Sequence, residues 1–212
     1  DANRDFTPIT RIAVVPNVLV MTPATMARLG INDVKDLVGW ARRNPGKLSF
    51  GSGGNGSAGH LAGELLKSLA GIRMVHIPYK GAAPAKTDLL AGQTELMFDN
   101  LASAMPQIKA GQLKALAVTS SQRDRMAPEV PTMIESGIKG FDINTWFGLF
   151  GPAQLPTAIR DRLHASATLA LQSSTVTEAL TTLGAAAAPM APAAFEDYIR
   201  AEQRKYQELV KA

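Results

Sequence analysis

The chain has 212 residues, of which 46% are hydrophobic and 19% are charged, as in an ordinary folded protein. Lys and Arg number 22 against 18 Asp and Glu, and this mild, scattered excess predicts no nucleic-acid partner. The sequence contains no cysteine, which excludes disulfides, thiolate catalysis and cysteine-ligated zinc. No apolar run approaches the ~20 residues of a membrane span. We predict neither a cofactor nor a metal.

Strands and helices alternate along the first two thirds of the chain. Apolar, β-branched segments predict strands over residues 9–21 (one long strand, or two broken at Pro16), 47–50, 74–78, 95–98 and 113–118. Helical spacing predicts a helix capped by Asn32, a second capped by Ser57 and ended by Gly71, and others over residues 84–91 and 102–110. This order is typical of an α/β fold with a largely parallel sheet.

The pattern changes after residue 140. An aromatic strand is predicted over residues 141–150, and helices follow over 157–171, over 176–183 and from about 192. We expect Trp146 and Phe147 to lie in the core, with stacking on a ligand as the alternative. Strands are scarce here, so these helices need another surface to pack on, and we place a domain boundary near residue 140.

The glycine-rich segment between a predicted strand and a predicted helix is the most informative part of the chain. Glycine has no Cβ, so such a turn can adopt positive φ and let a ligand approach the backbone. The N–H groups at the start of the following helix lack intrahelical partners and favour an anion. The sequence therefore predicts a site for a small anionic group, formed by Gly51, Ser52, Gly53, Asn55, Gly56 and Ser57.

Three other interpretations of this segment have less support from the residues. It matches G-x-G-x-x-G formally, but no Asp or Glu lies between Glu64 and Asp88, where a dinucleotide site needs an acidic residue. It lacks the Gly-Lys-Ser/Thr that a phosphate-binding Walker A loop needs. It could also be only a tight turn, although Ser52, Asn55 and Ser57 add more polar groups than a turn requires.

Ser57 and His60 suggest a nucleophile and a base. They are three residues apart at a helix start and so share a face. Catalysis would also need an orienting acid and an oxyanion hole, and no nearby residue supplies the acid. We keep a serine hydrolase or a nucleotide-dependent enzyme that uses residues 51–57 as the alternative hypothesis. We interpret His76, in an apolar strand, as a core histidine.

Polar residues follow two more predicted strands, at the ends where α/β sheets bind ligands. Tyr79 and Lys80 follow one strand, and Asp99 and Asn100 follow another. Asp99 and Asn100 make a weak metal site, because no further carboxylate or His has suitable spacing. We expect these residues to line a cleft.

Matching segments occur in order along nearly the whole chain, at residues 5–9, 44–48, 51–57, 60–66, 76–81, 97–101, 108–120 and 146–152. Through them the chain resembles the tripartite tricarboxylate transporter substrate-binding proteins, also called the Bordetella uptake gene family of periplasmic receptors. The resemblance implies a fold similar to type II periplasmic binding proteins, with two α/β domains joined by crossing strands.

In the terms of that family, residues 1–11 would end the first domain, residues 12–140 would form the second, and residues 141–212 would return to complete the first. The family also has a Pro-Pro-Gly-Gly-type loop that faces the glycine segment, and this sequence has none. We therefore expect that roughly the first third of the mature protein is missing and that the first domain is incomplete.

The resemblance implies a non-enzymatic receptor in the periplasm that hands a small carboxylate to a membrane transporter. The carboxylate would be a dicarboxylate, a tricarboxylate, an amino acid or an aromatic acid. The glycine segment would cradle it, His60 and Asn100 would support it, and Tyr79, Lys80 and Asp99 would line the cleft. We also expect the truncated chain to associate with itself where helices after residue 140 lack a partner.

Overall fold

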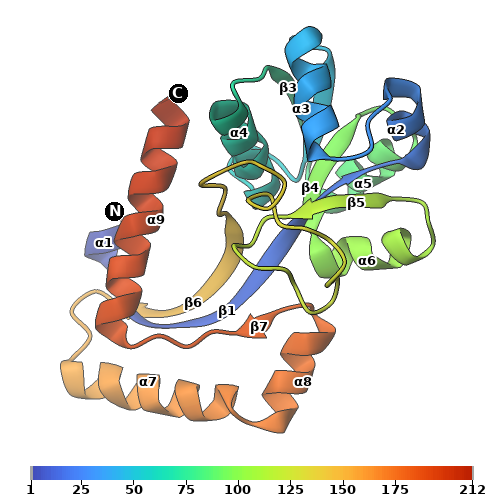
Figure 1. Cartoon of the computed structure of the whole chain (residues 1–212). Coiled ribbons are helices and arrows are strands. Elements are labelled where there is room, and N and C mark those ends of the chain that lie inside the picture. The colour runs from blue at the N-terminus through green and yellow to red at the C-terminus, as the bar shows by residue number, and fades with distance from the viewer. Residues whose placement is uncertain (1, 212) are drawn as a thin grey trace. The chain divides into compact units, whose positions relative to one another are not determined.

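The computed structural model describes residues 2–211, with side chains for residues 4–207. Contacts divide the chain into two compact units (Figure 1). Unit 1 comprises residues 2–15 and 145–211, and unit 2 comprises residues 16–144. The expected domain boundaries at 11/12 and 140/141 concern the intact receptor and stay a prediction.

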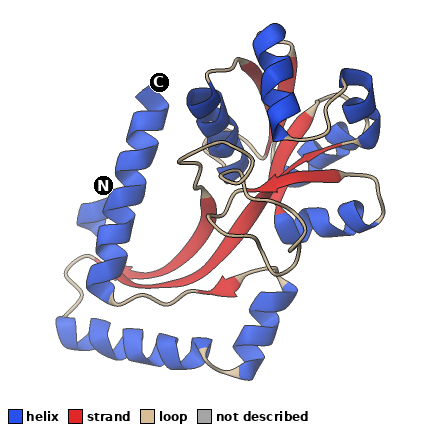
Figure 2. Ribbon diagram, viewed as in Figure 1, coloured by secondary structure: helices blue, strands red, loops and turns tan. Residues whose placement is uncertain are grey.

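Unit 2 alternates strands with helices (Figure 2). In chain order its elements are the second half of β1 (Phe6–Met21), α2 (Pro23–Leu29), α3 (Val34–Arg43), β2 (Leu48–Ser52), α4 (Ala58–Ala70), β3 (Met74–Pro78), α5 (Ala82–Leu90), β4 (Leu96–Asn100), α6 (Leu101–Lys109) and β5 (Lys114–Val118).

The strands of unit 2 form a sheet in the order β3-β2-β4-β1-β5. β2 runs parallel to β3 and to β4, whereas β1 runs antiparallel to β4 and β5. The largely parallel sheet is thus confirmed, with β1 as the exception. Because β2, β3 and β4 run the same way, their carboxyl ends meet at one edge, where Asn17 of β1 lies opposite Asn100.

The two faces of this sheet carry different helices. On one face, α5 and α6 bury a cluster that includes Val18, Val20, Met97 and Leu89. On the other face α4 packs so closely that a Cβ at Gly63 would lie 2.1 Å from the ring of Phe50. Side chains alternate along a strand, so Phe50 and Ser52 point to the α4 face and Gly51 points to the α5 face.

Of the two alternatives for residues 9–21, one strand or two strands broken at Pro16, the structure has the first, because β1 is one continuous strand. Its pairing partners change at this point: Ala13 and Val14 pair with β7, whereas Asn17 onward pairs with β4 and β5. Proline has no N–H to donate to a ladder. Pro16 therefore fits the position in β1 between the residues that pair with β7 and those that pair with β4 and β5.

Local capping explains two further differences from the sequence prediction. The N-cap of α3 is Asp33 rather than Asn32, and its side chain accepts a hydrogen bond from Asp36 N at 2.8 Å. Asn32 instead donates its own N–H to the Asp36 carboxylate. Helix α2 was not expected, although Thr22 caps it, Pro23 begins it and Gly30 ends it.

Unit 1 pairs the first half of β1 with β6 (Asn144–Pro152) and β7 (Ala186–Ala187). Its helices are α1 (Ala2–Asp5), α7 (Thr157–Leu171), α8 (Ser174–Thr182) and α9 (Pro192–Lys211). Phe195 of α9 packs against Trp146 and Phe150 of β6, but Phe147 is 54% exposed, so the core prediction for Phe147 is wrong. β7 was not expected.

Two glycines inside helices provide a matched test of the α4 packing. Gly63→Ala places a methyl group inside the ring of fully buried Phe50, and we expect it to lower the free energy of unfolding by about 2 kcal/mol. Gly39→Ala in α3 meets only the flexible end of Arg43 and should raise stability by about 0.5–1 kcal/mol through helix propensity. Urea unfolding measures both, and equal effects would contradict this packing.

Candidate functional site

The loop between β2 and α4 is held in shape by its own backbone and by the loop after β3. Gly54 and Gly56 have φ of 123° and 78°, which residues with a Cβ rarely adopt. The N–H groups of Tyr79 and Gly81 donate to the carbonyls of Ser52 and Gly53 at 3.0 and 3.2 Å. Two loops from neighbouring parallel strands therefore support each other at one edge of the sheet.

Ser57 is the N-cap of α4, as the sequence predicted, and its Oγ accepts a hydrogen bond from His60 N at 3.3 Å. Within the described part of the chain, no group accepts a hydrogen bond from the N–H of Gly53, Asn55 or Ala58. None of these three residues is buried. The loop and the helix start thus present three available donors with the positive end of the α4 dipole behind them.

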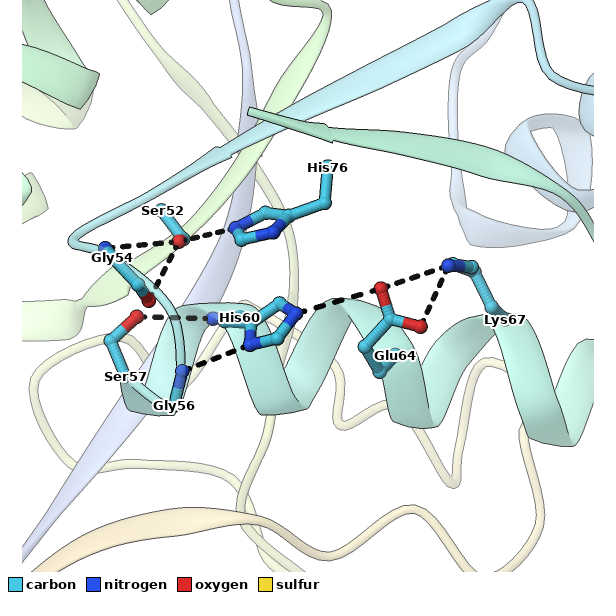
Figure 3. Close-up of polar contacts among 8 residues, drawn as sticks. All are labelled: Ser52, Gly54, Gly56, Ser57, His60, Glu64, Lys67 and His76. Carbon is cyan, nitrogen blue, oxygen red and sulfur yellow. Dashed lines mark hydrogen bonds and ion pairs between the residues drawn. The ribbon is translucent and has the colours of Figure 1, made fainter. Parts of the chain in front are cut away.

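Two histidines lie against the other N–H groups of the loop (Figure 3). The Nδ1 of His60 accepts a hydrogen bond from Gly56 N at 3.0 Å. The Nε2 of His76 lies 2.6 Å from Ser52 Oγ, which in turn accepts a bond from Gly54 N at 3.2 Å. The two imidazole rings stack with centroids 3.9 Å apart. Burial lowers the pKa of His76, and the neighbouring His60 lowers it further.

This geometry does not pair Ser57 with the ring of His60, because the Nδ1 of His60 is bonded to Gly56 and its Nε2 faces Glu64 at 3.8 Å. The serine in contact with an imidazole is Ser52, and Ser52 is fully buried. A buried hydroxyl cannot reach a substrate, so neither serine is placed as a nucleophile.

Tyr79 and Lys80 lie next to the loop in sequence and backbone, but their side chains do not join it. The hydroxyl of Tyr79 donates to Asp88 of α5 at 2.8 Å, and the ring lies on the α5 face, against Gly51. Burial and then the Asp88 bond raise the pKa of Tyr79. Lys80 is exposed and has no hydrogen-bond or ion-pair partner among the described residues.

Asp99 and Asn100 point to opposite faces of the sheet, because side chains alternate along β4. Asp99 is 2% exposed and forms an ion pair with Lys86 of α5 at 3.0 Å, and Lys86 also donates to Ser103. Asn100 lies on the α4 face, and its Oδ1 caps α6 through Ala102 N at 3.1 Å. Asn100 is therefore at the same edge and face as the glycine loop, and Asp99 is not.

Asn17 is a feature of this edge that the sequence interpretation missed. It lies opposite Asn100 on the α4 face and is 3% exposed. Its backbone N–H donates to Thr119 Oγ1 at 3.0 Å, but its side-chain Nδ2 has no acceptor among the described residues. A buried donor without an acceptor is costly, which marks this amide as a polar group to examine. Only the register of β1 could have revealed it.

Other kinds of site find no support in the residues that the structure describes. Among them, no group of three or more His, Asp or Glu could hold a metal ion. Helices long and apolar enough to span a bilayer are likewise absent from the described residues. The arrangement suits binding of a small anion by backbone N–H groups.

A family model described as "Tripartite tricarboxylate transporter family receptor" matches residues 1–212. The chain belongs to this family. The resemblance expected from the sequence is thereby confirmed, and membership of a receptor family does not favour the enzyme alternative.

Curated relatives of this receptor family match the chain almost from end to end. It is 40% identical over 210 residues to the "UPF0065 protein in tcbD-tcbE intergenic region" of Pseudomonas sp. (strain P51), covering 99% of this chain and 61% of that relative. It is 32% identical to "Protein BugT" of Bordetella pertussis, covering 98% of this chain and 62% of that protein. The chain thus spans about three fifths of their length.

Solved structures confirm the receptor fold. The chain superposes on "R. palustris Rpa4515 with adipate" with a TM-score of 0.85 and 34% identity, covering 100% of this chain and 69% of that one. For "MatC (Rpa3494) from Rhodopseudomonas palustris with bound malate" the TM-score is 0.79 at 28% identity, covering 97% and 69%. The chain thus spans about 69% of the length of each of these structures.

The buried ion pair at this edge gives a test of the site's framework. Lys86→Met leaves the carboxylate of Asp99 buried without its partner, and we expect a loss of about 3 kcal/mol in the free energy of unfolding. Arg123→Met breaks an exposed pair with Glu135 in the same unit, and it should cost much less because solvent screens that pair. Chemical denaturation compares them, and a Lys86→Met loss no larger than that of Arg123→Met would contradict the assignment.

Proposed function

We propose that the chain is the part of an extracytoplasmic receptor that carries the glycine ligand loop, and that it binds one carboxylate group of a small dicarboxylate. The observation that carries this proposal is the set of available N–H groups of Gly53 and Asn55 in the loop and of Ala58 at the start of α4. Family membership supports it, as do the solved structures of similar proteins with adipate and with bound malate.

The other predicted residues take different roles within this proposal. Four residues shape the loop with their polar groups: Ser52, Gly56, Ser57 and His60. They act on the ligand indirectly, by positioning the backbone of the loop. Gly51 lies inside β2 and faces α5. Asn100 is placed to support the ligand with its amide, whereas Tyr79, Lys80 and Asp99 have no direct contact in the proposal.

Delivery of the ligand to a tripartite tricarboxylate transporter in the membrane, from the periplasm, is the cellular role that we propose. The family description is that of a receptor for such a transporter. A tricarboxylate, an amino acid or an aromatic acid remains a ligand class to be compared with dicarboxylates, because backbone donors recognise the carboxylate group and not the rest of the molecule.

The affinity of this chain alone should be low. A hydrogen bond to a charged group contributes about 1.5–3 kcal/mol net. Three such bonds, set against the entropy lost on association, leave binding in roughly the millimolar range. Tighter binding needs contacts from a facing domain, which also exclude water.

Chemical shift perturbation by NMR suits this range. Adipate should shift the amide signals of Gly53, Asn55 and Ala58 in a saturable way, with malate, citrate, aspartate and benzoate as the comparison panel. Gly54→Ala should weaken binding at least about tenfold. The positive φ at this position is strained for alanine, and its Cβ would lie 3.1 Å from Tyr79 O.

Gly71→Ala is the matched control for that variant. Gly71 also has positive φ, but it lies at the other end of α4, and no atom lies within 4 Å of the position that a Cβ would take there. The Gly71→Ala variant should therefore bind adipate as the unchanged chain does. If no carboxylate of the panel shifts the loop amides at any soluble concentration, the proposed function is wrong.

A further inference from the structure

We propose that His60 and His76 are a pair of positioning residues that hold the glycine loop in its ligand-binding shape, and that His60 does so only as a neutral imidazole. Each ring fixes one end of the loop. His76 is bonded to Ser52 at the end of β2, and His60 is bonded to Gly56 just before the α4 cap (Figure 3). The consequence for ligand affinity rests on the proposed function, whereas the positioning itself does not.

The bonds also decide which loop N–H groups remain available. Gly56 N donates to His60, and Gly54 N donates to Ser52 Oγ, which His76 holds at 2.6 Å. The alternate donors of Gly53 and Asn55 have no such partner among the described residues. The imidazoles therefore engage the N–H groups of Gly54 (through Ser52) and Gly56, and they leave those of Gly53 and Asn55 for an anion.

The protonation state of His60 follows from its partners. Nδ1 accepts a hydrogen bond, so it carries a lone pair and the ring proton is on Nε2, facing Glu64. A second proton could attach only to Nδ1, where it would meet the N–H of Gly56. Protonation therefore removes this bond and releases the loop at that end.

The stacking of the two rings opposes charge on both of them. His76 lies between Phe50, with centroids 4.9 Å apart, and His60, with centroids 3.9 Å apart. Two imidazolium ions at that separation would repel each other. The charged groups that face the rings are Glu64 and Lys67, which pair with each other at 2.7 Å and so largely compensate one another.

The sign of the pH dependence follows. The ordered loop binds fewer protons than the released loop, so acid favours release. As pH falls, the ordered fraction should therefore fall, and the Kd of a ligand that needs the ordered loop should rise by up to about tenfold per pH unit. Attraction between an imidazolium and the bound anion would give the opposite sign.

Two side-chain amides mimic the two ring nitrogens without titrating. Asn at position 60 can place Oδ1 near the position of Nδ1, and Gln at position 76 can place its amide near that of Nε2. His60→Asn and His76→Gln should keep the loop ordered, and His60→Leu and His76→Leu should release it.

The experiment follows the amides of Gly54 and Gly56 by NMR between pH 8 and pH 5 without ligand. In the unchanged chain the Gly56 signal should move together with the titration of His60. In His60→Asn it should stay constant, and in His60→Leu it should take its low-pH position at every pH. His164→Asn, on α7, is the control and should follow the unchanged chain.

For His76, the Gly54 signal should shift in His76→Leu and stay in place in His76→Gln. The proposal is overturned if Gly56 is insensitive to pH while His60 titrates, or if the Asn and Leu variants at position 60 behave alike. Adipate binding is then measured over the same range, and it should weaken in acid for the unchanged chain but not for His60→Asn. Absence of adipate binding at every pH would count against the proposed function only, since the ligand-free titration judges the histidines.

Discussion

The close approach of α4 to the sheet is the constraint on which the rest of the site depends. Gly63 lies against the ring of Phe50, and a Cβ at Gly59 would lie only 2.5 Å from Phe98 O. Because neither position carries a side chain, the first turn of α4 lies directly over β2 and β4. The helix start, where the N–H of Ala58 has no acceptor among the described residues, is thereby fixed beside the carboxyl ends of both strands.

The close packing of α4 on the sheet explains why the loop before α4 needs so many glycines and so few reactive side chains. The chain must leave β2, turn through positive φ at Gly54 and Gly56 and enter a helix that lies almost on the strand. Ser52, Ser57 and the two histidines then satisfy the polar groups that this turn would leave unpaired. Shape, rather than a reactive group, is what these residues provide.

The sequence predicted the elements that local chemistry determines. The N-cap Ser57, the C-cap Gly71 and helix α7 follow from short-range signals and agree with the structure. The continuity of β1 through Pro16 and the short strand β7 depend on which strands lie alongside, and no local pattern carries that information. The same holds for Asp99: its motif predicted a cleft residue, but strand alternation turns it to the α5 face, where Lys86 pairs with it.

The role of His76 shows the same limit from the opposite side. An imidazole within an apolar strand suggested a core residue, and its ring does stack on Phe50, yet its Nε2 holds Ser52 at the end of the ligand loop. Register decides this, because His76 pairs with Phe50 in β2 and so shares a face with Ser52 two residues on. A side chain that stabilises the core and a side chain that shapes the site are here the same one. The effect of a substitution at position 76 on the stability of the fold must therefore be separated from its effect on the loop. Only a variant that keeps the bond to Ser52 but cannot titrate, such as His76→Gln, separates the two.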